Sequence, residues 1–277
     1  MLARMANVST HQLAFDGQRV TKTYRQWDRG EPRREWDCLT LLHRHRPGLA
    51  PEPLQHALDA DPPSIVMTRV PGVSLANVGR LAPEQCAGIV VALERLHTAI
   101  PATALADVPL RRFHAAEAVT ELRTWMAEGH EVGDDDLTNS ALDEAGRWLG
   151  SQEADSLASA AGTPVFTHGD GNLSNFVWSD QTGSASIVDF EDAGSSDRAY
   201  ELADLTEHIS TWVDGSLDTA ALLQRVEIDK RDTGRFRQCR RLFATFWLLM
   251  MLPDGRAHTR NPAGTLHRQV ERVFEVL

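Results

Sequence analysis

Three polar side chains in one short stretch have the types that metal-dependent chemistry uses. Asp170 and Asp189 supply carboxylates, and Asn175 supplies an amide oxygen. Hard cations such as magnesium prefer oxygen ligands of this kind. Two carboxylates and an amide around magnesium recur in phosphoryl transfer, where one aspartate accepts the proton of the substrate hydroxyl. The stretch from His168 to Asp192 is therefore the candidate chemical centre of the chain.

A β-hairpin is the element that would bring these three side chains together. An apolar run, a turn and a second apolar run follow one another at residues 175–178, 180–183 and 184–188. This order is typical of two strands joined by a short turn. With the turn centred near residues 181–182, Asn175 and Asp189 face each other at the open end, and Asp170 lies at the same edge. The alternative is a solvated acidic hairpin in some other α/β protein.

The spacing of these residues resembles the aminoglycoside phosphotransferase and choline kinase-like family. That family's catalytic loop reads H-G-D-x-x-x-x-N, which occurs here from His168 to Asn175, and its metal motif I-D-F-E resembles Val188–Glu191. The resemblance implies an α+β, bilobal, protein-kinase-like fold. A small antiparallel-sheet N-terminal lobe would take residues 1–72 and bind nucleotide. A mostly helical C-terminal lobe would take residues 73–277 and hold the catalytic hairpin and the substrate site. Asp170 is then the catalytic base, and Asn175 and Asp189 hold magnesium.

The N-terminal segment predicts a second hairpin that carries a lysine. Residues 7–15 and 18–24 read as two strands around a turn at Asp16-Gly17. Val20, Lys22 and Tyr24 share one face of the second strand, because side chains alternate between the two faces. An exposed edge strand is the simpler explanation for a lysine at that position.

A helix follows, and it places a carboxylate beside its packing stripe. Pro32 suits the first turn, and Glu35, Leu39 and Leu42 fall on one face. A carboxylate there is costly unless it is paired, and Lys22 is the obvious partner. The resemblance gives the pair a role, with Lys22 on the nucleotide phosphates and Glu35 orienting it. Alone, Glu35 could equally be an ordinary surface acid.

Residues 64–72 read as a buried strand that ends at a Pro-Gly turn. This segment resembles the interlobe hinge of the family. By that match, Met67 lines the back of the adenine pocket, and the backbone of Thr68 and Val70 bonds the adenine edge. The alternative is a plain core strand, since a Pro-Gly stop discriminates poorly.

Acidic side chains are the weak candidates for recognising a cationic substrate. Such runs are usually solvated loops, but the family often inserts substrate elements where residues 128–136 lie. The substrate-binding candidates are Asp134, Asp135, Glu191 and Glu207. The shared motifs do not choose among acceptors.

Bulk properties narrow the class of protein. The 277 residues carry a net charge of −11, which argues against non-specific nucleic-acid binding and is compatible with a cationic partner. Three scattered cysteines form no disulfide framework or zinc spacing. No signal peptide or run of about 18 apolar residues is evident. We therefore expect a cytoplasmic protein with a small-molecule substrate and neither nucleic acid nor membrane as partner.

These observations predict a magnesium-dependent kinase that uses ATP or GTP. An aminoglycoside or a related cationic, hydroxylated antibiotic is the expected acceptor, and choline, homoserine or a sugar is the alternative within the family. A nucleotide-binding module without catalysis is the competing class, because no glycine-rich loop precedes the first strand. Without that loop, Asn7, Ser9 and Thr10 could offer phosphate contacts, and the grip on the phosphates would depend more on Lys22 and magnesium. A protein kinase is disfavoured because no activation segment follows Asp189.

Overall fold

The computed structural model describes residues 11–130, 132, 135–226, 228–230, 232–255 and 257–277. The chain forms two compact units. Unit 1 contains residues 1–112 and 165–195, and unit 2 contains residues 113–164 and 196–277. The division falls at other points than the predicted lobe boundary at residue 72, because the catalytic hairpin and the segment 73–112 group with the N-terminal sheet. The assignment of separate nucleotide and substrate roles to two lobes stays a prediction.

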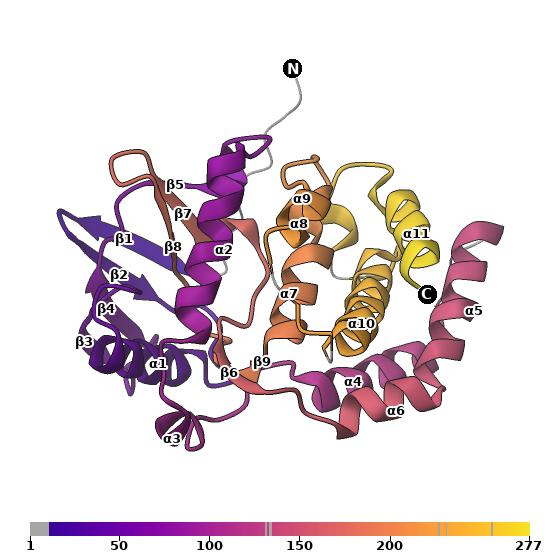
Figure 1. The fold of residues 1–277 in the computed structure, drawn as a ribbon, viewed down its shortest axis with the longest axis horizontal. Helices are drawn as coiled ribbons and strands as arrows, with labels where there is room; N and C mark the ends of the chain where they lie inside the picture. Colours follow the sequence, from indigo (N-terminus) through magenta and orange to yellow (C-terminus); the bar gives the residue numbers. More distant parts are fainter. Residues whose placement is uncertain (1–10, 131, 133–134, 227, 231, 256) are drawn as a thin grey trace. The chain divides into compact units, whose positions relative to one another are not determined.

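Unit 1 contains a four-stranded antiparallel sheet, drawn in indigo and violet in Figure 1. Its strand order is β1-β2-β4-β3, with bounds Gln12–Asp16, Arg19–Thr23, Ser64–Thr68 and Pro53–Ala57 respectively. The predicted first hairpin is confirmed for its described part, since β1 pairs with β2 from Gln12↔Thr23 to Asp16↔Arg19. Residues 7–10, three of which were candidate phosphate contacts, lie outside the described residues.

Strand β2 buries the face that the period of two predicts. Val20, Lys22 and Tyr24 are buried there, at 9 %, 3 % and 0 % exposure. β4 pairs with the edge of β2 opposite β1, in a register that sets Lys22 opposite Ile65 and Val20 opposite Met67. Lys22 therefore lies in the middle of the sheet, and the edge-strand explanation for it is wrong.

Helix α1 (Glu31–His45) begins as the sequence predicts and packs on β3 and β4. Gly30 precedes it with φ 79°, a left-handed conformation that glycine adopts without steric cost. Glu35, Leu39 and Leu42 all point inward, each at 0 % exposure. The carboxylate of Glu35 is thus carried into the interior by the same stripe that anchors the helix.

The rest of unit 1 contains the hairpin predicted to hold the catalytic residues and the elements around it. Strands β5 (Val73–Ser74), β7 (Phe176–Ser179) and β8 (Ser184–Ile187) form a sheet in the order β5-β7-β8. Helix α2 (Pro83–His97) packs against it. The shorter elements are η1 (Leu75–Asn77), α3 (Ala102–Leu105), β6 (Pro164–Thr167), η2 (Leu173–Asn175) and β9 (Gly194–Asp197). β6 pairs with β9, and the chain passes between the two units within these strands.

Unit 2 is helical (Figure 1). Its elements are α4 (Ala115–Glu128), α5 (Asp136–Leu149), α6 (Gln152–Ser159), α7 (Arg198–Glu207), α8 (Ile209–Trp212), α9 (Thr219–Leu223), α10 (Thr233–Met251), η3 (His258–Arg260) and α11 (Thr265–Val276). α10 packs on α7 and α11. Its core includes Leu248 and Val273, both fully buried. The small antiparallel sheet of unit 1 and the helices of unit 2 confirm the predicted α+β class.

One predicted helix is interrupted. The apolar residues Leu202, Leu205, Ile209 and Trp212 have the spacing of one continuous helix, but α7 ends at Glu207 and α8 begins at Ile209. His208 breaks it with an extended backbone (φ −60°, ψ 133°), and its side chain accepts from the N–H of Ser210 at 3.1 Å. A side chain that caps a new helix competes with continuation of the old one.

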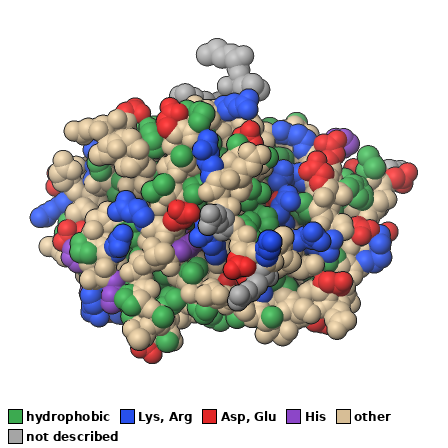
Figure 2. All heavy atoms as spheres, viewed as in Figure 1, with side chains coloured by type: hydrophobic (Ala, Val, Ile, Leu, Met, Phe, Trp, Pro, Cys, Tyr) green, Lys and Arg blue, Asp and Glu red, His purple; other side chains and the backbone are tan. Residues whose placement is uncertain are grey.

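The surface and the cysteines bear on the expected class of protein. On the face drawn in Figure 2, acidic and basic side chains are interspersed. All three cysteines lie in the described residues; each is buried and none is in a disulfide. Burial raises the pKa of the Cys38 thiol to about 12. Across the described residues, none of the helices is both long enough and apolar enough to span a bilayer.

Candidate active site

The loop His168–Asp170 depends on a glycine that nothing else can replace without rearrangement. Gly169 has φ 93°, and a Cβ placed there would lie 2.3 Å from the carbonyl oxygen of Asp192. The ring nitrogens of His168 lie 2.9 Å from the carbonyl oxygens of Asp170 and Val188. His168 therefore braces the loop against the end of the hairpin, and Gly169 allows the two segments to touch.

Asp170 and Asn175 are brought into direct contact. The carboxylate of Asp170 accepts from the backbone N–H of Asn172 at 3.0 Å and from the side-chain amide of Asn175 at 2.9 Å. Asp170 is half-buried, so its carboxylate is fixed in direction and still reaches solvent. A carboxylate held in this way has the geometry that a positioned base needs.

Asp189 lies one residue away from the predicted position opposite Asn175. The hairpin pairs Phe176 with Ile187, and the next backbone bond runs from the N–H of Val188 to the carbonyl of Asn175 at 2.9 Å. Asp189 then leaves the strand with φ 73°, a left-handed conformation that is rare for residues other than glycine. The turn redirects its side chain away from the hairpin edge and toward Lys22.

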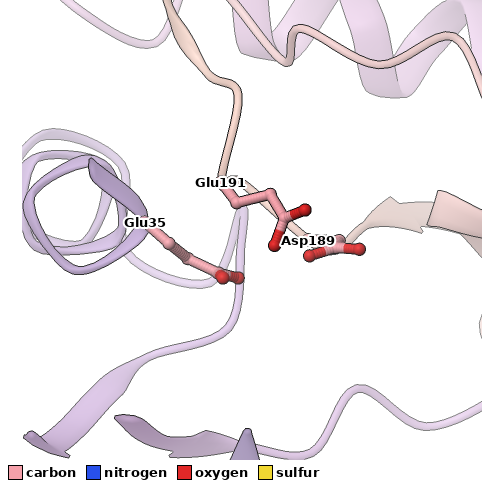
Figure 3. Close-up of side chains that lie close together, drawn as sticks. All are labelled: Glu35, Asp189 and Glu191. Atoms are coloured by element: carbon pink, nitrogen blue, oxygen red, sulfur yellow. The ribbon is translucent and has the colours of Figure 1, made fainter. Parts of the chain in front are cut away.

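Lys22 lies at the centre of three carboxylates. Its ammonium donates to Glu35 at 2.6 Å, to Glu191 at 2.7 Å, and to Asp189 in a further ion pair. Figure 3 shows these carboxylates converging, with Glu35 reaching from α1 and the other two from the segment after β8. The predicted Lys22–Glu35 pair is thus present in the structure.

Two further donors fix Glu35. The hydroxyl of Tyr24 donates to its Oε2 at 2.5 Å, and the N–H of Phe190 donates to its Oε1 at 3.2 Å. Both carboxylate oxygens are satisfied, and the side chain is fully buried. Glu35 is a rigid anchor for Lys22.

The proton affinities of the site follow from these contacts. Burial lowers the pKa of Lys22, but Glu35 and Asp189 outweigh it, so the pKa is raised well above its usual value. Burial raises the pKa of Asp189 to about 6 against the opposing charge of Lys22. For Glu191, burial is outweighed by the hydrogen bond of His11 and the charge of Lys22, and its pKa falls to about 2.

Asp192 adds another carboxyl group near the loop. Burial, the charge of Asp170 and the charge of Glu191 raise its pKa to about 6. The buried guanidinium of Arg111 opposes this rise and donates to the carbonyl of Gly169 at 2.6 Å. The centre is therefore strongly acidic, with Lys22 and Arg111 as buried compensating charges.

The predicted hinge residues take ordinary places at the end of β4. Met67 is buried at 7 % exposure and pairs with Val20. Thr68 donates its N–H to the carbonyl of Glu52 at 2.9 Å. Val70 is half-buried in the extended stretch that follows. Their adenine-binding role stays a prediction.

The acidic substrate candidates are mostly engaged by the protein itself. Asp134 lies outside the described residues. Asp135 caps α5 by accepting from the hydroxyl of Thr138 at 2.6 Å. Glu207 is buried at 1 % exposure between Arg240 and Arg272, at 2.5 and 2.8 Å.

These contacts weaken the case for the acidic residues as substrate-binding candidates. A cationic substrate would have to displace an arginine to reach Glu207, and Glu191 already binds Lys22. The sequence pattern identified these acids but could not show that other residues of the chain neutralise them.

His11 and Tyr24 are site residues that the sequence reasoning did not assign. Extending the β1–β2 register by one step sets His11 opposite Tyr24, and their rings lie 4.7 Å apart. His11 Nε2 lies 2.7 Å from Glu191. The hairpin register is the signal that could have found both residues, because it places them beside Lys22.

Comparison with known proteins places the chain in a well-defined group. The model of the phosphotransferase enzyme family matches residues 16–237. No sequence among the curated proteins matches.

Solved structures share the fold. The choline kinase LicA from Streptococcus pneumoniae is 14 % identical, with a TM-score of 0.60 over 99 % of this chain and 90 % of that one. The GDP complex of aminoglycoside 2'-phosphotransferase-IIIa is 17 % identical, with a TM-score of 0.65 over 98 % and 90 % of the two chains. An aminoglycoside phosphotransferase from Streptomyces rimosus, bound to ADP and streptomycin, is 20 % identical, with a TM-score of 0.56 over 82 % and 87 %. At these identities the likeness shows the fold alone.

Proposed function

Because the chain belongs to the phosphotransferase enzyme family, we propose that it is a small-molecule kinase. It transfers the γ-phosphate of ATP or GTP to a hydroxyl group of an aminoglycoside or a related cationic antibiotic. The observation that carries this proposal lies within unit 1, where the half-buried Asp170, fixed by Asn172 and Asn175, occurs together with the buried Lys22–Glu35 pair. A positioned base and a buried cation are the parts that phosphoryl transfer requires.

Asp170 orients the acceptor hydroxyl and takes its proton as the oxygen attacks the γ-phosphorus. Its two hydrogen bonds hold the carboxylate without protonating it, so that it remains an acceptor. Lys22, aligned by Glu35, neutralises charge on the phosphate oxygens. Most of the rate enhancement then comes from positioning and electrostatics.

The residues present fit a magnesium ion. Asn175 and Asp189 offer hard oxygen atoms, which magnesium prefers. Around Lys22 three carboxylates face one ammonium, so two negative charges remain uncompensated by that lysine. We propose that Asn175 and Asp189 hold the ion, which when bound supplies charge neutralisation at the phosphate oxygens.

The nature of the acceptor rests on charge. The net charge of −11 favours a cationic molecule, and fold neighbours include complexes with hygromycin B and with streptomycin. The alternative acceptor is choline, homoserine or a sugar, and the choline kinase neighbour favours it. A catalytically weak nucleotide-binding protein is the alternative class, favoured by the full set of carboxylates already bound to Lys22.

One assay separates these possibilities. The protein is incubated with magnesium and either ATP or GTP, and with a panel of aminoglycosides, cyclic peptide antibiotics, choline, homoserine and amino sugars. Mass spectrometry then detects phosphorylated acceptors. Asp170→Ala is the negative control, and Asp59→Ala, an exposed aspartate of the β3–β4 loop, is the matched control. Transfer to choline alone would select the alternative acceptor. Nucleotide binding without any transfer would select the binding module.

A further inference from the structure

Lys22 has no spare hydrogen atom in the structure. Its ammonium carries three N–H groups, and they face Glu35, Asp189 and Glu191. If Lys22 is to contact phosphate, as the proposed function requires, one of these bonds must be given up. Which bond is released depends on how firmly each carboxylate is held.

Asp189 is the least restrained of the three carboxylates. Glu35 is bound on both oxygens and fully buried. The side chain of Asp189 is 36 % exposed, against 14 % for Glu191. Asp189 is also the carboxylate proposed to turn toward the metal. Lys22 would then keep two anchors, Glu35 and Glu191.

His11 holds the second anchor. Its Nε2 lies 2.7 Å from Glu191 Oε2, the same oxygen that binds Lys22. The Nε2 and Oε2 atoms are therefore at hydrogen-bonding distance. His11 is 4 % exposed and rests against the ring of Tyr24.

The backbone N–H of Arg25 determines which ring nitrogen of His11 carries a hydrogen atom. The N–H of Arg25 points at Nδ1 at 3.3 Å. Since a backbone N–H can only donate, Nδ1 is the acceptor and Nε2 carries the hydrogen. That hydrogen faces the carboxylate of Glu191, so His11 acts on Glu191 as a donor.

We propose that His11 is a positioning residue of the nucleotide site: it fixes Glu191 as the second carboxylate anchor of Lys22. This inference rests on the proposed function. The contact joins the start of β1 to the segment after β8, so it ties the first strand of the sheet to the metal motif. Losing a hydrogen bond to a charged group typically costs about 10-fold or more in affinity.

Two isosteric substitutions test the donor. In His11→Gln the side-chain amide N–H can replace the N–H of Nε2. In His11→Asn the shorter amide can meet only the Arg25 N–H. We expect His11→Asn to weaken binding of the magnesium–ATP complex about tenfold in calorimetry, and His11→Gln to stay within about threefold of the wild type. His43→Phe is the matched control, since His43 lies 3.8 Å from Glu52 in an exposed pair outside the network.

A second readout follows Lys22 itself. Peptide mapping after brief treatment with an amine-acylating reagent measures how often the ammonium leaves its carboxylates. We expect faster labelling of Lys22 in His11→Asn than in the wild type or in His11→Gln. Because this readout needs no nucleotide, it tests the anchor even if the proposed function fails.

The outcomes separate the two proposals. If the wild type binds neither ATP nor GTP with magnesium, the proposed function fails. If labelling of Lys22 is also equal in all variants, the role of His11 fails too. Equal nucleotide affinity and equal labelling in His11→Asn and the wild type overturn the role of His11 alone. Equal losses in His11→Gln and His11→Asn also overturn it, since the ring would then matter for packing only. Melting temperatures show whether each variant is folded in the assay.

Discussion

Lys22 on β2 and Tyr24, the residue that directly follows this strand, bind the same oxygen atom of Glu35. The ammonium lies 2.6 Å from Oε2, and the hydroxyl 2.5 Å from it. Removing Glu35 would leave a buried ammonium and a buried hydroxyl without this acceptor. Removing one partner of a buried pair usually costs more than the pair contributes.

This shared oxygen makes the effects of Lys22 and Glu35 non-additive. We expect Lys22→Ala and Glu35→Ala each to lower kcat/KM, with Lys22→Ala losing on the order of 10²-fold. The double mutant should be little worse than Lys22→Ala alone, because the two residues share one task. A double-mutant cycle on phosphoryl transfer measures the coupling. The exposed pair Glu144–Arg147 provides the control cycle, and strictly additive losses at Lys22 and Glu35 would show that they act separately.

Asp170→Ala should nearly abolish transfer while the fold persists. The carboxylate accepts from Asn172 and Asn175 in its own loop, and a positioned base contributes roughly 10²–10⁴-fold. Initial rates with a competent acceptor, together with a melting curve, measure both effects. Turnover within about tenfold of the wild type would rule out Asp170 as the base.

Asp189→Asn should weaken binding of the magnesium–nucleotide complex, because one formal charge facing the metal is lost. The substitution keeps the shape of the side chain at its left-handed backbone position. Calorimetry with magnesium–ATP, with Asp59→Asn as the exposed control, measures the change. Unchanged affinity and unchanged activity together would exclude Asp189 as a ligand.

Gly169→Ala should destabilise the loop more than Gly183→Ala does. Both glycines have positive φ, but only at Gly169 would the new Cβ meet another atom, 2.3 Å away on Asp192. Left-handed strain costs about 1 kcal/mol, so Gly183→Ala should lose about that much, and Gly169→Ala more. Urea denaturation measures both free energies of unfolding, and equal losses would show that the loop shifts freely.

Cys38 should resist alkylation in the native protein. Its thiol is buried and its pKa is raised to about 12, so the reactive thiolate is scarce near neutral pH. At about pH 8, labelling of Cys38 should be far slower in the native protein than in the urea-unfolded chain, where the pKa is ordinary and much more of the thiol is thiolate. Iodoacetamide labelling followed by peptide mapping checks this. Rapid labelling of Cys38 in the folded protein would contradict its burial.

The residues that could be identified from the sequence are those marked by a motif or by the periodicity of a strand or helix. The loop spacing placed Asp170 beside Asn175, and alternation along residues 18–24 placed Lys22 inward toward Glu35. Asp189 lies one position past the expected one because the register Phe176↔Ile187 sets Val188 opposite Asn175. Its left-handed backbone also cannot be read from a strand pattern. Asp135 turned out to cap its own helix through Thr138, which is a local contact, whereas Glu207 is bound by two arginines that come from other helices. Such compensation depends on tertiary contacts.

The hydrogen bonds from Tyr24 and Phe190 to Glu35 limit how the activity of this chain can be turned off, because they restrain helix α1. Some kinases are silenced by swinging the glutamate-bearing helix outward. Here that motion would leave the Tyr24 hydroxyl and the Phe190 N–H in the interior without their acceptor, each at a cost of about 1–3 kcal/mol. Helix α1 is therefore held inward before any ligand arrives. An inactive state with this helix displaced outward would therefore be costly in this chain.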